Sequence, residues 1–548
     1  MIKNLTIVAG KEGKKIFPDD FLRREIFKTD CTFDISLILT KRQKLEYLVA
    51  EIELNEKPEF WRGSDYSWQK IDTPFLSANY HSSKILKFSN GQYLVGTKTQ
   101  GCWEWDSSTS KLRWFIVHPD LNPTFKYNSD DIREWITESQ LEKDQEFELG
   151  FYYGAGPVPE FARTPIGFVP TVTFTDHCDF DEAQLLKAQR EFFKNAGIRI
   201  TKGFFLYTYS HRGDYAAMDQ EEMEEEYRLW ENDGHELAYH GLSRSFRENS
   251  WEEFRNLTSP TGFNTVSTYI DHGFLEYNYS KTPNSESQAW FRNVEEKGIN
   301  LIWNYIDIVE ANALSNNQLN PRTSSIEAIN KCADYHFKNN LPLDKSRDLK
   351  TWLAYATTES LNKSIKNLSG FANRGTGNPI KFTDFLINLT RTIFYSLDPE
   401  IWWKNIFEIG KPFSFNRFSP VVFKAINQIN SNVYSFQTIS VKDLETVFSR
   451  VSIDKLHRES GLMIAHTYFS FLGKNHPGRL FLDETGILNP GPEQNLRNLG
   501  EEIRAEKIWN PTVNVLTDFH QKLMNLTFSL EKGKLQIQNS PGPVRYID

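Results

Sequence analysis

The sequence is poor in cysteine and has no long apolar run. Its four cysteines, Cys31, Cys102, Cys178 and Cys332, lie far apart and form no CxxC pair. This spacing excludes a disulfide framework and a structural zinc knuckle, which need closely spaced cysteines. No run of about 18 apolar residues is present, so no transmembrane helix is predicted. The first apolar stretch is too short for a signal peptide, and we expect a cytoplasmic protein.

Basic charge is not in excess either. The chain has 63 Lys and Arg against 72 Asp and Glu, which gives a formal net charge of −9. Such a balance creates no positive field that attracts nucleic acid or anionic lipid, so we expect neither as a partner. We also find no internal repeat or low-complexity tract, and domain boundaries must therefore come from changes of pattern.

What the sequence does have is a set of short alternating runs over residues 1–161. Examples are "CTFDISLILT" and "LEYLVAEIEL", separated by Gly, Asn, Asp, Ser and Pro. Alternation of this kind predicts half-buried strands, and here an amino-terminal domain similar to a β-sandwich. The stretch "YYGAGPVPEFARTP" interrupts regular structure and indicates the end of this domain near residue 161.

Strands and amphipathic helices alternate after this stretch. The strand "VTFT" is followed by the helix "DEAQLLKAQREFFKNAG", and the same succession is repeated through "INLIWNYID". This order predicts parallel strands with crossover helices, either as an open doubly wound sheet or as a closed barrel. No glycine-rich phosphate fingerprint follows the first strand, which argues against a dinucleotide fold.

Helical patterns replace the strands between residues 309 and 449, for example in "DLKTWLAYATTESLNKSIKNLSG". The α/β pattern resumes with "ESGLMIAHTYFSF". We therefore predict a second domain, residues 162–548, which is an α/β barrel with a helical insertion at 309–449.

Histidines and carboxylates gather at the predicted strand ends. They are His177, His211, His240, His272 and His466, with Asp176, Asp179, Asp271 and Asp307. The carboxyl ends of parallel strands meet at one face of a barrel, so this distribution predicts a single site. Imidazole and carboxylate groups bind zinc or act as general acids and bases. The alternative is that individual histidines cap strands or satisfy buried polar groups.

Three motifs resemble those of the polysaccharide deacetylase family, carbohydrate esterase family four. "TFTDH" (173–177) corresponds to the TFDDG motif, "GHELAYHGLSR" (234–244) to the HxxxH motif, and "LMIAH" (462–466) to a late strand that ends in histidine. The resemblance covers residues 165–309 and 450–523. It implies a (β/α)7-type barrel and the metal-dependent removal of N-acyl groups from a sugar. "DHCDFD", "HELAYH" and "DHG" are similar to a divergent subgroup from surface-polysaccharide gene clusters.

The sequence also departs from the family pattern. The family takes a general base and a metal ligand from the two aspartates of its first motif, but here Thr175 and Asp176 stand in these places. Arg244 replaces the second histidine of HxxxH. The resemblance therefore implies a rebuilt site that holds a divalent metal, most simply zinc. The expected ligands are Asp176, His177, His240 and His272.

The same hypothesis assigns catalytic and binding roles. Asp179 or Asp271 activates water, unless Asp179 is itself a ligand, and His466 protonates the leaving amine. The expected substrate-binding residues are Arg244, Trp303 and Tyr305. For the two aromatic side chains the alternative role is core packing.

Three neighbouring residues have simpler interpretations. Asp181 directly precedes a helix and is expected to be its N-cap. Cys178 is expected to be a packed thiol. Asp307 either joins the site or caps the insertion.

These observations leave three hypotheses of function. The first is a cytoplasmic metal-dependent carbohydrate deacetylase that acts on a polysaccharide or its precursor. The second is a glycosidase that uses two carboxylates such as Asp179 and Asp271. The third is a non-catalytic protein that binds or assembles glycans on a degenerate barrel. In all three the partner is a carbohydrate.

Overall fold

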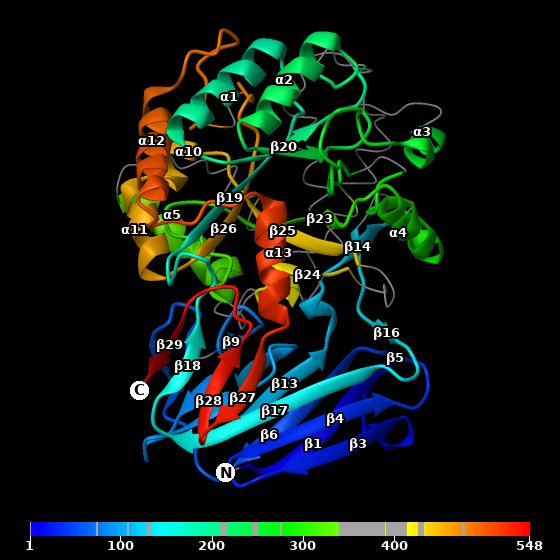
Figure 1. Ribbon diagram of the computed structural model, residues 1–548, viewed down its shortest axis with the longest axis vertical. Helices are drawn as coiled ribbons and strands as arrows, with labels where there is room; N and C mark the ends of the chain where they lie inside the picture. Colours follow the sequence, from blue (N-terminus) through cyan, green and yellow to red (C-terminus); the bar gives the residue numbers. More distant parts are fainter. Residues whose placement is uncertain are drawn as a thin grey trace.

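The structure is a computed structural model that describes most of the chain. The described residues are 2–72, 75–106, 109–128, 133–208, 216–243, 250–273, 277–338, 390, 414–425, 432–473, 476 and 478–548. A β-rich amino-terminal region lies below a barrel of strands and helices in the view of Figure 1. In these residues no helix has both the length and the apolar character needed to cross a membrane.

Two antiparallel sheets form the amino-terminal region, as the alternating runs predict. The first sheet has the order β2 (Lys14–Ile16), β1 (Ile2–Lys11), β6 (Tyr47–Leu54), β13 (Lys111–Val117), β12 (Cys102–Asp106) and β9 (Leu76–Ala78). The second has the order β3 (Leu22–Lys28), β4 (Thr32–Leu39), β17 (Glu146–Ala155), β11 (Gln92–Gly96), β10 (Ile85–Lys87), β7 (Phe60–Arg62) and β8 (Trp68–Lys70). Side chains of both sheets, such as Trp103 and Phe151, share one apolar core.

Short two-stranded pairs complete the β structure. They are β14 (Phe125–Tyr127) with β15 (Arg133–Trp135), β16 (Ser139–Leu141) with β5 (Gln43–Leu45), β18 (Val158–Phe161) with β29 (Val544–Ile547), and β27 (Thr527–Glu531) with β28 (Lys534–Gln538). The boundary at residue 161 stays a prediction. The pairing of β29 with β18 brings the last strand of the described chain back to the amino-terminal region.

Seven parallel strands close into a barrel. Around the ring they are β19 (Thr171–Asp176), β20 (Thr201–Phe204), β21 (Glu236–Tyr239), β22 (Thr268–Ile270), β23 (Leu301–Glu310), β25 (Tyr434–Ser440) and β26 (Leu462–Thr467). The pairs β26–β19 and β23–β25 close the ring, and β24 (Val422–Lys424) lies antiparallel to β25. This confirms a parallel barrel preceded by a β-rich region.

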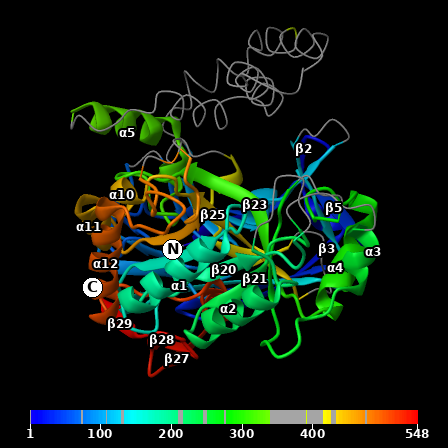
Figure 2. The same cartoon turned by 90° about the horizontal axis from the view of Figure 1, so that it is seen from above.

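Helices surround these strands, as the view from above shows for α1, α2, α4, α11 and α12 (Figure 2). The described helices are α1 (Ala183–Ala196), α2 (Glu221–Asn232), α3 (Ser250–Asn256), α4 (Ser287–Glu296), α5 (Ile326–Lys338), α10 (Leu444–Val447), α11 (Arg450–Arg458), α12 (Pro490–Arg504) and α13 (Val513–Met524). Alternate strand residues face this layer. Val172 and Phe174 of β19 pack with Leu186 and Phe193 of α1.

The helix α13 closes the amino-terminal end of the barrel. Its Val513 and Leu516 pack with the inward side chains Leu462 and Ile464 of β26. The other side of α13 contacts the amino-terminal region, where the Tyr80 hydroxyl is 2.8 Å from Nδ1 of His520. The carboxyl end of the barrel is therefore the open end.

Most of the predicted helical insertion, 309–449, lies outside the described residues. In its described part, α5 is helical, but β24 and β25 are strands. Sequence analysis missed β25, which is needed to close the barrel. Its run "YSFQTIS" is short and largely polar, so its alternation gives a weak signal even though five of its seven residues are buried.

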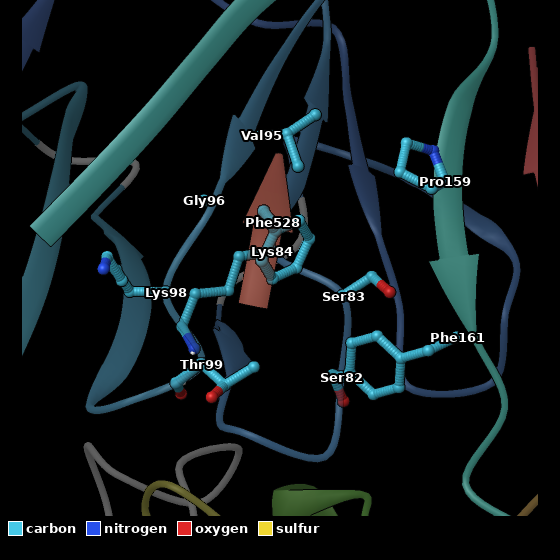
Figure 3. A pocket seen from close by; sticks show the side chains of 10 residues that line it. All are labelled: Ser82, Ser83, Lys84, Val95, Gly96, Lys98, Thr99, Pro159, Phe161 and Phe528. Atoms are coloured by element: carbon cyan, nitrogen blue, oxygen red, sulfur yellow. Dashed lines mark hydrogen bonds between the residues drawn. The ribbon is translucent and has the colours of Figure 1, made fainter. Parts of the chain in front are cut away.

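A buried lysine lies in the amino-terminal region beside a small cavity of about 10 Å³, which has room for one water (Figure 3). Nζ of Lys84 donates a hydrogen bond to the carbonyl oxygen of Thr99 at 2.6 Å. In the described chain no ion pair is recorded for it. Burial lowers the pKa of Lys84 to about 7. Phe528 of β27 lines the same cavity, so the carboxyl-terminal hairpin packs here.

We expect the substitution Lys84→Met to raise the thermal unfolding midpoint at about pH 7. In the unfolded chain the lysine pKa is about 10.4. Between about pH 10.4 and about pH 7 the unfolded chain therefore binds more protons than the folded protein does. Stability is therefore lost as the pH falls through this window, by up to about 4 kcal/mol. Calorimetry should show that the advantage of K84M shrinks as the pH rises toward about 9.

The matched control is Lys98→Met, which changes a partly exposed lysine on the same cavity that pairs with Glu148. It is expected to change the midpoint little, because such surface pairs contribute about 0–1 kcal/mol. A K84M midpoint at or below that of the wild type at neutral pH contradicts the interpretation.

Candidate active site

Several histidine side chains point into the open end of the barrel, because residues along a strand alternate between its two faces. Leu462 and Ile464 of β26 point into the barrel, so His466 two residues further points the same way. The same alternation carries His240 inward beyond Ala238 of β21. His177 follows β19 and lies between them, with its ring centroid 4.5 Å from that of His240 and 3.9 Å from that of His466.

The carboxylate of Asp179 contacts two imidazoles, those of His240 and His272. Its Oδ2 is 3.0 Å from Nε2 of His240, and its Oδ1 is 2.7 Å from Nε2 of His272. Burial alone raises the pKa of Asp179, but His272 and His240 more than offset this effect and hold it well below its usual range. Asp179 is therefore an ionised carboxylate that joins the ends of β21 and β22.

The imidazole of His177 is buried and has a free ring nitrogen. No hydrogen-bond partner is recorded in the described chain for its Nε2, which is a costly arrangement for a buried polar atom. Burial, with His466 and His240 nearby, lowers the pKa of His177 well below its usual range. Burial also lowers the pKa of His240, although Asp179 opposes the shift. Burial thus favours the neutral form of both rings, which is the form that can donate a lone pair.

These groups fit a divalent cation. One ligand atom from each of His177, Asp179 and His240 lies within 4.8 Å of the other two. Two imidazole nitrogens and one carboxylate oxygen are a common ligand set of catalytic zinc, which keeps a further position open. The orphaned Nε2 of His177 is the observation that supports this fit.

His466 pairs with Asp307 of β23 beside this group. Its Nδ1 is 3.0 Å from both carboxylate oxygens of Asp307, which also accepts a hydrogen bond from Oγ1 of Thr438 at 2.7 Å. Burial raises the pKa of Asp307, but His466 and Thr438 more than offset this effect and lower it. The carboxylate fixes the tautomer of His466 and leaves Nε2 to exchange a proton. Asp307 therefore joins the site.

The structure does not bring Asp176 to this cluster. Asp176 points outward from the barrel, where it pairs with Nζ of Lys202 and accepts a hydrogen bond from the Phe469 amide at 2.9 Å. It is fully buried in this ion pair. Because neighbouring residues of a strand face opposite sides, Asp176 cannot share a cation with His177. Its prediction as a metal ligand is therefore corrected.

Asp181 is also corrected, because it is no helix cap. Its carboxylate lies 2.5 Å from Nζ of Lys202 and accepts a hydrogen bond from Ser470 at 2.7 Å. The N-cap position belongs to Glu182. Burial alone lowers the pKa of Lys202, but Asp176 and Asp181 more than offset this effect, so the pKa is raised. Burial raises the pKa of Asp176 to about 6, against the effect of Lys202.

Asp271 lies apart from the cluster as well. Its carboxylate accepts hydrogen bonds from the amides of Gly273 at 2.6 Å and Ser280 at 2.9 Å, and from the Ser280 hydroxyl at 3.0 Å. It therefore orders the loop after β22. Its catalytic role, alone or as partner of Asp179 in a glycosidase, stays a prediction.

The predicted substrate-binding residues have mixed positions. Trp303 is buried against the site, 4.8 Å from the ring of His177 and 4.9 Å from that of His466. Tyr305 packs on Trp303 at 5.1 Å and is partly exposed. Arg244 and the histidine at 211 lie outside the described residues. Cys178 is buried with Phe205 and Ala217, as expected for a packed thiol.

Sequence reasoning missed Lys202 and Tyr468. Lys202 lies in an apolar strand, and its signal was one charge in the run "ITKGFF". Tyr468 packs its ring 4.9 Å from that of His466 and 5.3 Å from that of His177. Its signal was its place two residues after His466, on the same side of the strand.

Zinc titration tests the ligand set. We expect one zinc ion to bind per chain, and the variants D179N and H240Q to weaken it at least about tenfold. The control is H235Q, which changes a buried histidine at the opposite end of β21, where Nδ1 accepts a hydrogen bond from the Ile200 amide. Equal zinc affinity in H240Q and H235Q contradicts the assignment.

The variant K202M tests the buried ion cluster. It leaves Asp176 and Asp181 without their cation, and we expect the free energy of unfolding to fall by about 3–5 kcal/mol. The control K194M removes a largely exposed lysine that pairs with Asp233. Equal denaturation midpoints for K202M and K194M would be the contrary result.

Comparison with known proteins gives little further information. No protein-family model and no curated protein matches this sequence. An α-galactosidase from Thermus thermophilus in complex with stachyose is 10% identical, with a TM-score of 0.22 over 54% of this chain and 65% of its own length. The alignment thus spans less than two thirds of that enzyme.

Two further solved structures are similarly distant. A xylosidase from Aspergillus niger is 12% identical, with a TM-score of 0.19 over 56% of this chain and 42% of its own. A GH31 dextranase from Flavobacterium johnsoniae complexed with glucose is 7% identical, with a TM-score of 0.26 over 98% of this chain and 72% of its own. Likeness at this level carries no argument about function.

Proposed function

We propose that the chain is a metal-dependent hydrolase that removes an N-acyl group from a sugar. The observation that carries this proposal is the convergence of His177, Asp179 and His240 beside the His466–Asp307 pair. The first group offers ligands for a divalent cation, with zinc as the simplest candidate, and the second offers a general acid and base. The resemblance of three motifs to polysaccharide deacetylases agrees with this chemistry and stays a prediction.

A divalent cation bound by His177, Asp179 and His240 would polarise the acyl oxygen and lower the pKa of water. The rest of the chemistry falls to the chain. Asp179 is kept ionised and fixed in orientation by His272, from which it is 2.7 Å away. This arrangement is typical of a second residue that orients a ligand.

His466 is the group that moves the proton. Hydrolysis of an amide adds the oxygen of water to the acyl carbon and breaks the carbon–nitrogen bond, so the departing amine needs a proton. Nε2 of His466 takes a proton from water and gives it to the amine nitrogen. Asp307 holds the Nδ1–H tautomer and stabilises the imidazolium between these steps.

Aromatic side chains shield this proton transfer from solvent. Trp303 donates its indole N–H to Thr438 at 3.0 Å, which fixes the ring beside His177 and His466. The ring of Tyr468 packs against the same two imidazoles and against Phe180 at 5.6 Å. Burial in these surroundings lowers the pKa of His177 and so favours its neutral form.

A glycosidase is the second candidate, because two carboxylates, Asp179 and Asp307, lie in the site. That mechanism needs one carboxyl group with a raised pKa as general acid. The pKa values of Asp179 and Asp307 are both lowered by their histidine partners after burial is offset. The site therefore favours hydrolysis in which His466 supplies the proton.

The test is acetate release from N-acetylated mono- and oligosaccharides by the zinc-loaded protein. We expect H466N to lower kcat by about 10²–10⁴ while it leaves zinc affinity unchanged, because a general acid and base is lost. The control H235Q should keep wild-type kcat.

Other outcomes separate the alternatives. Release of free sugar from aryl glycosides without metal supports the glycosidase. Glycan binding without any turnover, unchanged in the double variant D179N/H240Q, supports the non-catalytic protein. Either result overturns the proposed deacylation.

A further inference from the structure

A polar cavity lies between the amino-terminal region and the closed end of the barrel. Its volume is about 130 Å³, well above the space that one water needs. Asn317, which lines it, accepts a hydrogen bond at its Oδ1 from the amide of Leu462, the first residue of β26. His466 lies near the other end of that strand, so this cavity is distinct from the candidate active site.

Both halves of the molecule contribute to its wall. The amino-terminal sheets contribute the segment between β7 and β8 and the start of β9, and the barrel contributes the loop 317–322 and the residue that follows α11. The polar lining groups are Ser64, Asp65, Gln69, Ser77, Asn317, Asn320, Arg322 and Glu459. Trp61, Phe75, Leu76 and Pro321 add apolar surface.

The cavity lining carries charges of both signs, two carboxylates (Asp65 and Glu459) and one guanidinium (Arg322). Glu459 pairs with Lys455 at 2.7 Å and accepts a hydrogen bond from Asn317 at 2.9 Å. Asp65 accepts hydrogen bonds from the amide and hydroxyl of Ser67 at 3.0 and 2.8 Å. Nε2 of Gln69 also donates a hydrogen bond to Asp65 at 3.4 Å, and Arg322 adds a positive charge to the same lining. An anionic ligand would meet two carboxylates, and a cationic ligand would meet Arg322.

Arg322 keeps donors for a ligand. Within the described residues its side chain makes one hydrogen bond, from Nη2 to the Phe75 carbonyl at 3.5 Å, which is the limit of such a contact. A guanidinium group has five N–H donors. The amides of Gln69 and Asn320 and the carboxylates of Asp65 and Glu459 add further donors and acceptors to the same wall.

We propose that this cavity is a binding site for a neutral pyranose sugar. A pyranose presents hydroxyl groups that both donate and accept, which suits carboxylate, amide and guanidinium groups on one wall. Its C–H face suits the apolar surface of Phe75, which is partly exposed, whereas Trp61 is buried in the core of the amino-terminal region. The proposal is independent of the proposed function, because none of its residues belongs to the candidate active site.

The experiment is titration of the full-length protein with methyl glycosides of glucose, galactose and N-acetylglucosamine, followed by saturation-transfer NMR and calorimetry. We expect at least one glycoside to bind saturably, with the affinity reduced at least about tenfold in R322A and in Q69A, since each loses hydrogen bonds to a buried ligand. The matched control R450A changes an exposed arginine on α11 that pairs with Asp454 and Glu502.

Binding should persist in the double variant D179N/H240Q, which separates this site from the active site. Loss in that variant, with none in R322A, would overturn the proposal. So would the absence of saturable binding, or tighter binding of methyl glucuronide than of methyl glucoside. If Q69A and R322A lower the thermal midpoint, the comparison is made at a temperature at which each variant is folded.

Discussion

The carboxylate of Asp179, shared between Nε2 of His240 and Nε2 of His272, determines how the rest of the site is arranged. The two imidazoles follow β21 and β22, which pair in parallel, so their side chains emerge side by side at the same end of the barrel. His177 and His466 reach the same point from β19 and β26 because these two strands pair directly and in parallel.

The buried ion cluster on the outside of the same strands anchors the loop that carries Asp179. Nζ of Lys202 contacts Asp176 at the end of β19 and Asp181 two residues beyond Asp179. Through Phe469 and Ser470 the two carboxylates also bind the segment after His466. One lysine thus fixes both segments that supply the candidate active site. Its cost in desolvation is tolerated because two anions and several hydrogen bonds surround it.

The sequence predicts the architecture well, because strand and helix periods are local properties. The barrel, the β-rich amino-terminal region, and the proximity of five polar residues all follow from apolar strands that end in polar residues. The five residues are His177, Asp179, His240, His272 and His466. The short strand β25 could not be predicted, since its residues are buried by partners that lie far away in the sequence. Its run is short and largely polar, so the local pattern gives only a weak signal.

The errors at the site have one physical origin. A cluster of acidic residues beside a strand does not show which side chain points inward. Asp176 and His177 are adjacent in the chain, yet one faces the helices and the other faces the barrel. Asp181 pairs with a buried lysine, and Asp271 accepts hydrogen bonds from backbone amides. These partners become neighbours only after folding, so local patterns suggest a ligand and a cap where the structure has anchors.

The most direct measurement is zinc K-edge X-ray absorption on the zinc-loaded protein. The account predicts a first shell of two imidazole nitrogens and carboxylate or water oxygen at about 2.0–2.2 Å, with no sulfur. It also predicts loss of the imidazole scattering in the variant H177Q/H240Q. A zinc–sulfur distance of about 2.3 Å, or a spectrum unchanged by that substitution, would contradict the account.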